Sequence, residues 1–443
     1  MFKFFLIAVQ FFLVILVILF IISNSFIISF ELNDFIYSVS SSYIVIILLA
    51  GYLVLFILQS FYFKTKFSYS KYKINKFLKF KNKGFDSFVS GMIAVANKDY
   101  KTAIVESKKI SNSLDDNRSL SLLLKSEIFK IEKKYDDLKN IYLEMINNKA
   151  TENLGIRGMM EQYIKSQDYH HAFIYGEKLF NNNPNIEKIY DALVNIISKT
   201  NNWQQLIYIS EKAYNKKIIS KKLFNVNKSI GLFEIAKIKQ FSEVNESINY
   251  LEKALNIRKN FPPYVNLYLE ILIQNKDYNK AKKFLKKVWG ESPHPEFKSK
   301  VSMLANKIGM EIIDLVKLII SNNPQNETSK ILLVESFIHS KKWNLARNSI
   351  QKLLDVNPKK EVCLLMAKIE EGETGDIQKV KSWSMRANNG ADKNVWVCMF
   401  TAKAQNEWSS VSKGGYFNSL EWKQPYMLNN DLENIERFIN HEN

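Results

Sequence analysis

The chain has 443 residues and a formal net charge of +18. Arg occupies only six positions, so nearly all of the positive charge is Lys, which lacks the planar fork that reads bases and phosphates. The two cysteines are isolated and cannot make a disulfide framework. The composition therefore argues against a nucleic-acid-binding protein and against a small disulfide-stapled domain.

Two hydrophobic runs begin the chain, at about residues 4–23 and 42–63. Each has roughly the 20 residues that a helix needs to cross the hydrocarbon core of a bilayer. A cleaved signal peptide has a shorter apolar region and would not be followed by a second span. We therefore predict a transmembrane hairpin over residues 1–63.

The charges on either side of the second run predict its orientation. The connection from Asn24 to Ser41 carries Glu31 and Asp34 and no Lys or Arg, whereas the basic juxtamembrane segment 64–84 carries eight Lys. Positively charged flanks stay in the cytoplasm, so we expect both termini and everything after the second span to be cytoplasmic. Membrane lipid is an expected partner, because Lys near anionic headgroups gains ~1 kcal/mol per residue.

Residues 85–390 contain a recurring pattern. A polar turn ends in an aromatic residue, a small residue follows three positions later, hydrophobic residues follow near +7 and +10, and Pro follows near +15. The best copies are Tyr169, Ala172, Leu179 and Pro184; Tyr278, Ala281, Leu285, Val288 and Pro293; and Trp343, Ala346, Ile350, Leu353 and Pro358. Partial copies are Tyr100 with Ala103, Tyr135 with Leu138, Trp203 with Leu206 and Ala213, Ile312 with Val316 and Pro324, and Leu251 with Ala254.

This pattern resembles the tetratricopeptide repeat, a helix–turn–helix unit of about 34 residues. The small residue lets the second helix approach the first, and Pro ends the second helix. The predicted fold class is all-α, with the two-helix transmembrane hairpin followed by a tetratricopeptide-like α-solenoid. Such arrays bind partner proteins along a concave groove.

No motif for catalysis or for a cofactor is present, so we predict no enzyme, no cofactor and no catalytic site. We expect Glu370 and Glu371 to lie on a solvated face, and Gly372 to Asp376 to form a turn. None of the histidines has metal-ligand spacing, and His170 and His171 should diverge at a solvated helix start. The histidines are His170, His171, His294, His339 and His441.

Residues 391–427 form a tail with spaced aromatics. Trp396 and Cys398 make a W-x-C motif, and Trp408, Phe417 and Trp422 follow. This tail resembles that of alphaproteobacterial HemY proteins, in which paired cysteines form a zinc ribbon after two spans and a degenerate repeat array. The resemblance implies a bacterial inner-membrane protein associated with late haem biosynthesis and porphyrin metabolism, with haem-pathway enzymes as partners.

The tail departs from the family at the zinc ligands. Cys398 occupies the first cysteine position, but Thr401 and Ser412 occupy the second and third, and the fourth falls in Gly414–Gly415. A structural zinc site needs four Cys or His ligands, so we predict no metal and interpret Cys398 as a lone remnant. We expect the aromatics to persist in a degenerate zinc-ribbon-like tail, and residues 428–443 to form a polar C-terminal tail.

These observations favour a non-enzymatic, membrane-anchored scaffold that organises late haem biosynthesis. An envelope-assembly adaptor similar to the LapB group, which regulates lipopolysaccharide synthesis, is an alternative, although that group has one span. A haem- or porphyrin-binding protein using His170, His171 or His339 is a third possibility. The sequence does not say whether porphyrin is contacted.

The orientation gives the first prediction. A reporter fused after Lys83 should stay cytoplasmic, whereas a reporter fused near Asp34 should be exported, because the lysines hold the C-terminal flank inside. Reporter activity in intact cells measures both. Export of the Lys83 fusion would overturn the orientation.

Overall fold

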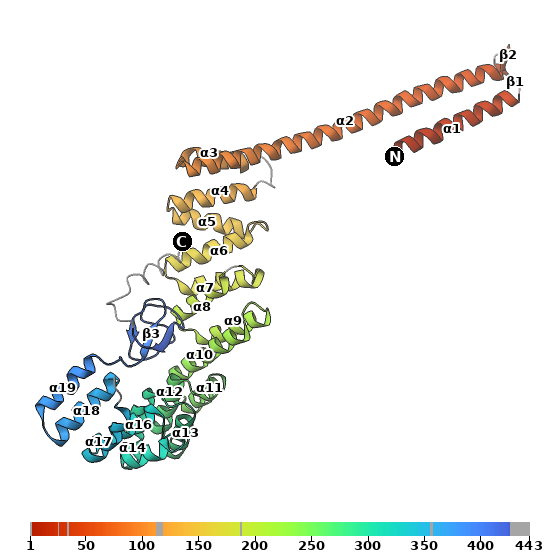
Figure 1. Ribbon diagram of the computed structural model, residues 1–443. Helices are drawn as coiled ribbons and strands as arrows, with labels where there is room; N and C mark the ends of the chain where they lie inside the picture. The colour runs from red at the N-terminus through yellow and green to blue at the C-terminus, as the bar shows by residue number, and fades with distance from the viewer. Residues whose placement is uncertain are drawn as a thin grey trace. The chain divides into compact units, whose positions relative to one another are not determined.

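A computed structural model describes residues 2–24, 26–32, 35–111, 118–186, 188–354 and 358–425. The chain divides into two compact units, Met1–Ile141 and Tyr142–Asn443, and the division falls inside helix α5. Each unit is built from antiparallel helix pairs, and short β-strands occur in both (Figure 1).

The first unit contains an apolar helix, a β-hairpin, a very long helix and the first repeats. Its elements are α1 (Phe2–Ser23), β1 (Ile27–Leu32), β2 (Phe35–Ser40), α2 (Ser41–Ala96), α3 (Tyr100–Ser111), α4 (Arg118–Ile131) and the start of α5 (Tyr135–Ile146). Strands β1 and β2 pair antiparallel, with Ile27 opposite Ser40 and Leu32 opposite Phe35. This hairpin lies in the connection for which the sequence predicted no strand.

Helix α2 is the one described helix long and apolar enough to cross a membrane. The described apolar part of α1, Ala8–Ser23, is shorter. Helix α2 continues without a break through residues 63 and 84, where the sequence indicated changes of segment. Its last turns bury Gly84, Ser87, Gly91 and Val95, so the same helix that begins as an apolar segment ends as the first helix of the repeats.

The second unit continues the array as pairs of an A helix followed by a B helix. The A helices are α6 (Glu152–Lys165), α8 (Ile189–Thr200), α10 (Lys221–Lys239), α12 (Pro262–Gln274), α14 (Lys298–Ile308), α16 (Glu327–His339) and α18 (Lys360–Glu373). The B helices are α7 (Tyr169–Asn182), α9 (Trp203–Asn215), α11 (Val244–Ile257), α13 (Tyr278–Glu291), α15 (Ile312–Ile320), α17 (Trp343–Ile350) and α19 (Ile377–Asn388). Two 3₁₀ turns, η2 (Pro295–Phe297) and η3 (Gln351–Leu353), adjoin them.

The turn between the two helices of a pair has the same geometry in five places. Two positions before the aromatic residue, the backbone is left-handed, with φ between 55° and 63°. The next residue, directly before the aromatic, donates its backbone amide to the carbonyl of the residue five positions earlier. These left-handed residues are Lys98, Lys133, Gln167, Lys276 and Lys341. This is the Schellman arrangement that satisfies the last carbonyls of a helix.

The residues after each turn occupy the positions that the repeat pattern predicted. Tyr100, Tyr135, Tyr169, Trp203, Tyr278 and Trp343 are each the first residue of a helix. The small residues Ala103, Ala172, Ala254, Ala281 and Ala346 are all 0% exposed. Local geometry and burial therefore confirm a tetratricopeptide-like repeat array over the described helices.

The tail of the second unit is a β-module rather than helix. Strand β3 (Val395–Cys398) lies between β4 (Ala404–Gln405) and β5 (Leu420–Lys423), and both neighbours are antiparallel to it. The all-α prediction therefore holds for the array and is wrong for two segments, the β1–β2 hairpin and this module. Residues 426–443, which include the whole of the predicted polar tail 428–443, lie outside the described residues.

Ala281 gives a test of the repeat register. It is fully buried at the crossing of α12 and α13, so Ala281→Trp should overpack the crossing and destabilise the chain by ~1–3 kcal/mol. The exposed change Lys283→Gln, on the same helix, should stay within ~0.5 kcal/mol. Thermal or denaturant unfolding measures both, and equal midpoints would show that the register is wrong.

Candidate interaction surface

Polar contacts join successive A helices of the second unit from α8 onwards. Asn227 on α10 donates its Nδ2 to the hydroxyl of Tyr190 on α8 at 2.7 Å, and Ser229 on α10 lies 3.2 Å from the hydroxyl of Tyr264 on α12. These groups are buried, so each bond satisfies atoms that water cannot reach. The A helices are thus held in register.

The later A helices are joined by charge. Lys300 on α14 donates to Glu270 on α12 at 2.7 Å, and Lys298 on α14 bonds Glu335 on α16 at 3.1 Å and Glu361 on α18 at 2.8 Å. Lys298 therefore bridges three successive pairs. Hydrogen-bonded ion pairs of this kind are stronger than neutral contacts. They place both positive and negative charge at this end of the surface formed by the A helices, which we call the A-helix face.

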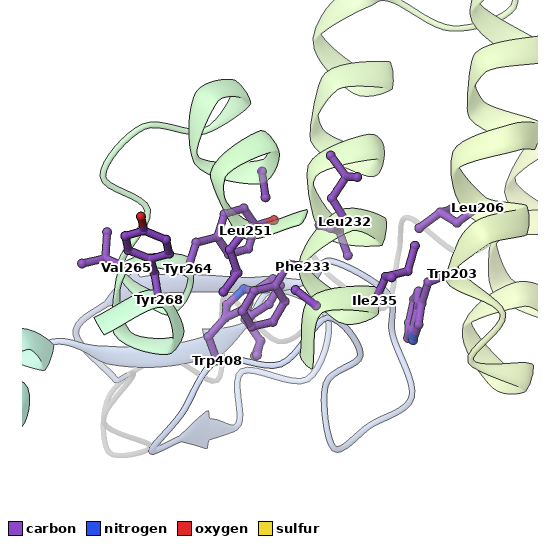
Figure 2. Close-up of a cluster of buried hydrophobic side chains, with 14 of the residues drawn as sticks. Trp203, Leu206, Leu232, Phe233, Ile235, Leu251, Tyr264, Val265, Tyr268 and Trp408 are labelled. Carbon is purple, nitrogen blue, oxygen red and sulfur yellow. The ribbon is translucent and has the colours of Figure 1, made fainter. Parts of the chain in front are cut away.

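The β-module packs onto the A helices through tryptophans. The ring of Trp408 lies 5.6 Å from that of Phe233 on α10, 5.3 Å from Phe261 and 6.1 Å from Tyr264 on α12. Figure 2 shows Trp408 beside Phe233 and Tyr264 in this buried cluster. Trp396 lies 5.9 Å from Phe261.

The buried area makes this docking stable. Trp396 is 3% exposed and Trp408 is 9% exposed. A large aromatic buries roughly 150–250 Å², which at ~25 cal/mol per Å² is roughly 4–6 kcal/mol of gross stabilisation for each ring. The module is therefore a built part of the unit and covers the middle of the A-helix face.

Two carboxyl groups lie at the contact between the module and the helices. Glu234 on α10 is 8% exposed, and burial raises its pKa while hydrogen bonds from Ser410 oppose that rise. Glu296 in η2 accepts a 2.6 Å bond from Nε1 of Trp396, and burial also raises its pKa. Arg258 stacks its guanidinium 3.6 Å from the ring centre of Phe261, so a positive charge also lies beside the aromatics.

His294 also contacts the module, next to Glu296. Its ring lies 4.7 Å from that of Trp422, and its Nδ1 accepts the amide of Glu296 at 3.3 Å. Burial lowers the pKa of His294 to about 4, so the imidazole is neutral when the module is docked. Sequence reasoning assigned His294 no role, because only the contact with a tail more than 100 residues away makes it distinctive.

The positions expected to replace zinc ligands come together. The sulfur of Cys398 lies 3.6 Å from the Ser412 hydroxyl and hydrogen-bonds to Thr401, and a Cβ at Gly414 would meet the Thr401 methyl at 3.3 Å. Ser419, which the sequence did not single out, lies 3.4 Å from the same sulfur. Burial raises the pKa of Cys398, but hydrogen bonds with Ser419, Thr401 and Ser412 outweigh it and lower the pKa to about 6.

This cluster holds one thiol and several neutral hydroxyls, which are poor zinc ligands. In the part of the chain that the structure describes, no group of three or more His, Cys, Asp or Glu side chains could hold a metal ion. Cys363 is buried in α18. The absence of zinc stays a prediction.

The other histidines are not brought together. His170 and His171 are exposed at the start of α7, with ring planes 80° apart, and His171 bonds Asp168 at 2.7 Å and stacks on Tyr163. His339 is exposed at the end of α16. His441 lies outside the described residues.

The expectation that Glu370 lies on a solvated face is wrong. Glu370 is 4% exposed and bonds Arg347 of the preceding B helix at 2.8 Å. A buried carboxylate needs such a partner, and no local pattern indicates that Arg347 of another helix would reach it. The turn at Gly372 to Asp376 is confirmed, since α18 ends at Glu373 and Gly375 is left-handed with φ 68°.

No known protein family matches this sequence, and no curated protein matches it. Among solved structures, Naa15/Naa10 bound to HypK-THB is 12% identical with a TM-score of 0.37, covering 69% of this chain, and this chain spans 58% of that one. The TPR2AB–pHSP90 complex of yeast Sti1 is 10% identical with a TM-score of 0.29, covering 69% of this chain and 98% of that one. A tetratricopeptide repeat protein from Parabacteroides merdae is 14% identical with a TM-score of 0.25, covering 56% and 99%. These superpositions are loose, so the fold assignment depends on the repeated turns and buried alanines.

The hydroxyl cluster around Cys398 predicts how the module responds to metal removal. The purified chain should contain no stoichiometric zinc, and a chelator should leave its thermal midpoint unchanged, because one thiol cannot close a tetrahedral shell. Trp422→Ala should instead loosen the module to protease while the array stays helical. One tightly bound zinc per chain would contradict this.

His294 predicts a pH dependence of docking. The pKa of the His294 imidazole is 6.5 in the unfolded chain and about 4 in the folded chain. The stability that the neutral imidazole contributes is therefore fully present above pH 6.5 and is lost as the pH falls towards 4. His294→Asn keeps an acceptor for the Glu296 amide and does not titrate. Between about pH 7 and about pH 5, the free energy that stabilises the docked module should fall by at most about 2 kcal/mol more in the wild type than in the variant.

Protease protection of the module measures this difference. The raised pKa values of Glu234 and Glu296 act in the opposite direction, because folding then favours their protonation as the pH falls. Both carboxyl groups are present in wild type and variant, so their effect cancels in the comparison. Equal pH dependence in the two proteins would show that His294 does not titrate on undocking.

Proposed function

We propose that this chain is a non-enzymatic, membrane-anchored adaptor that binds partner proteins through its helical repeats and organises late haem biosynthesis at the bacterial inner membrane. The observation that carries this proposal is the continuity of α2. One helix begins as an apolar segment at Ser41 and ends by burying Gly91 and Val95 within the repeats. Tethering raises the effective concentration of bound partners without a new contact surface.

The predicted orientation keeps the repeats in the cytoplasm, and Lys64 and Lys66 follow the apolar run at once. These two lysines are placed to meet anionic headgroups. The haem assignment is supported by the resemblance of the tail to HemY proteins, since the positions that the resemblance marks as ligands, Cys398, Thr401 and Ser412, do converge.

Partner binding is proposed for the A-helix face that the β-module leaves uncovered. Leu364 on α18 is 44% exposed and lies one turn from Glu361, which bonds Lys298. An exposed apolar side chain beside partly buried ion pairs supports this face as the protein-binding surface. Leu318 on α15, a B helix, is 37% exposed and provides a matched position on another face.

The test places a photo-crosslinking amino acid at Leu364 or at Leu318 in the full chain in native membranes. Adducts with late haem-pathway enzymes should form at Leu364 and be weak or absent at Leu318. Protein adducts without haem-pathway enzymes would refute the pathway assignment alone. Equal labelling at both positions, or none, would refute the A-helix face as the binding surface.

A further inference from the structure

The part of α2 between its apolar run and its buried end is an uncovered helix. Every residue from 64 to 83 is exposed. This stretch contains eight Lys and no Asp or Glu. No other described element of the first unit packs against it, although α3 and α4 cover the turns that follow.

Such a helix is poorly stable in water on its own. Most helices of this length depend on tertiary packing. This stretch contains no acidic residue of its own, and Asp86, just beyond it, lies one turn from Lys83 alone. Instead Lys79 and Lys83 are four positions apart, a spacing at which like charges repel. The segment therefore calls for a partner that covers apolar side chains and supplies negative charge.

Four exposed apolar side chains line up along one side of this helix, and Tyr69, Tyr72 and Phe80 are exposed on its other side. Phe67 is 72% exposed, Ile74 is 55%, Leu78 is 47% and Phe85 is 57%. At about 100° per residue these four fall within about 40° of one another. Lys71 and Lys81 each lie about 40° to either side of the centre of this face.

The repeats do not cover this face. The side of α2 that packs against α3 and α4 carries Gly84, Ser87, Gly91 and Val95. That side is rotated by roughly 130° from Phe67 and Leu78. Closer packing of the repeats on α2 would therefore leave the apolar face open.

We propose that the face formed by Phe67, Ile74, Leu78 and Phe85 binds an acidic amphipathic helix of a partner protein, with Lys71 and Lys81 pairing its carboxylates. An apolar stripe between two rows of charge is how helices select a partner helix. A second copy of this chain would bring lysine against lysine along the whole segment, which disfavours self-association.

A membrane surface is a poorer occupant. This step depends on the anchoring proposed above. If α2 leaves the bilayer at Lys64 with an ordinary tilt, Leu78 and Lys81 stand more than about 20 Å beyond it. The potential of anionic lipid decays within about 8 Å at physiological salt, so only the first lysines reach it.

The test uses the full chain in native membranes with p-benzoylphenylalanine in place of Leu78, or, as a control, in place of Lys76, which lies on the opposite side of α2. Irradiation should give a protein adduct at Leu78 and little at Lys76. The crosslinked peptide of the partner should be rich in Asp and Glu, with apolar residues at helical spacing. Lys71→Glu combined with Lys81→Glu should reduce the adduct about tenfold.

Each other outcome overturns the inference. Equal lipid adducts at Leu78 and Lys76 would assign the segment to the membrane surface. An adduct with the same chain or with a second copy would assign it to self-contact, and an adduct that survives the double charge reversal would exclude charge recognition. Recovery of the chain outside the membrane fraction refutes the anchoring, whereas loss of the adduct from membrane-bound chain refutes only the partner helix.

Discussion

The close approach of the two helices in each repeat is the constraint on which the rest of the array depends. At Ala103, Ala172, Ala281 and Ala346 the residue three positions after the turn is small and has no exposed surface, while fully buried leucines, Leu138 and Leu206, occupy this position in α5 and α9. Because each pair contacts mainly its neighbours, an error at one crossing would displace the next A helix. The bonds from Tyr190 to Asn227 and from Glu270 to Lys300 can form only when successive A helices stay in register.

The β-module changes what the array can offer to another protein. In the middle of the A-helix face, Phe233, Phe261 and Tyr264 already contact Trp408 of the same chain. On the module, Phe400 and Tyr416 stack at 4.8 Å and remain 65% and 43% exposed. The exposed surface of this region is therefore composite, made by segments far apart in sequence.

The sequence could predict whatever depends on local pattern. The aromatic residue after each turn and the alanine three positions later repeat along the chain, so their places in the structure followed from spacing alone. The convergence of Cys398, Thr401 and Ser412 was also accessible, because a family resemblance marks the positions. The positions of these residues are determined by interactions between neighbours in the sequence, which a repeated spacing reveals.

Contacts between distant segments were beyond such reasoning. Trp408 contacts Phe233, which lies 175 positions earlier in the sequence, and no periodicity connects them. His294 was passed over and Glu370 was misjudged for the same reason. The contact of His294 with Trp422 and that of Glu370 with Arg347 are made between separate elements and leave no local pattern. The β1–β2 hairpin was missed because its strands are flanked by stronger helical signals on both sides.

Helix α2 has a mechanical consequence. Between Gly51 and Gly84 it contains neither Gly nor Pro, the residues at which helices most often bend. Because such a helix does not bend, a change in its length changes both the position and the rotation of the repeats at its end. Each residue added to or removed from it would turn the first repeats by about 100° about the helix axis and shift them by about 1.5 Å. The number of residues in this segment therefore determines the rotational orientation of the first repeats about the axis of α2.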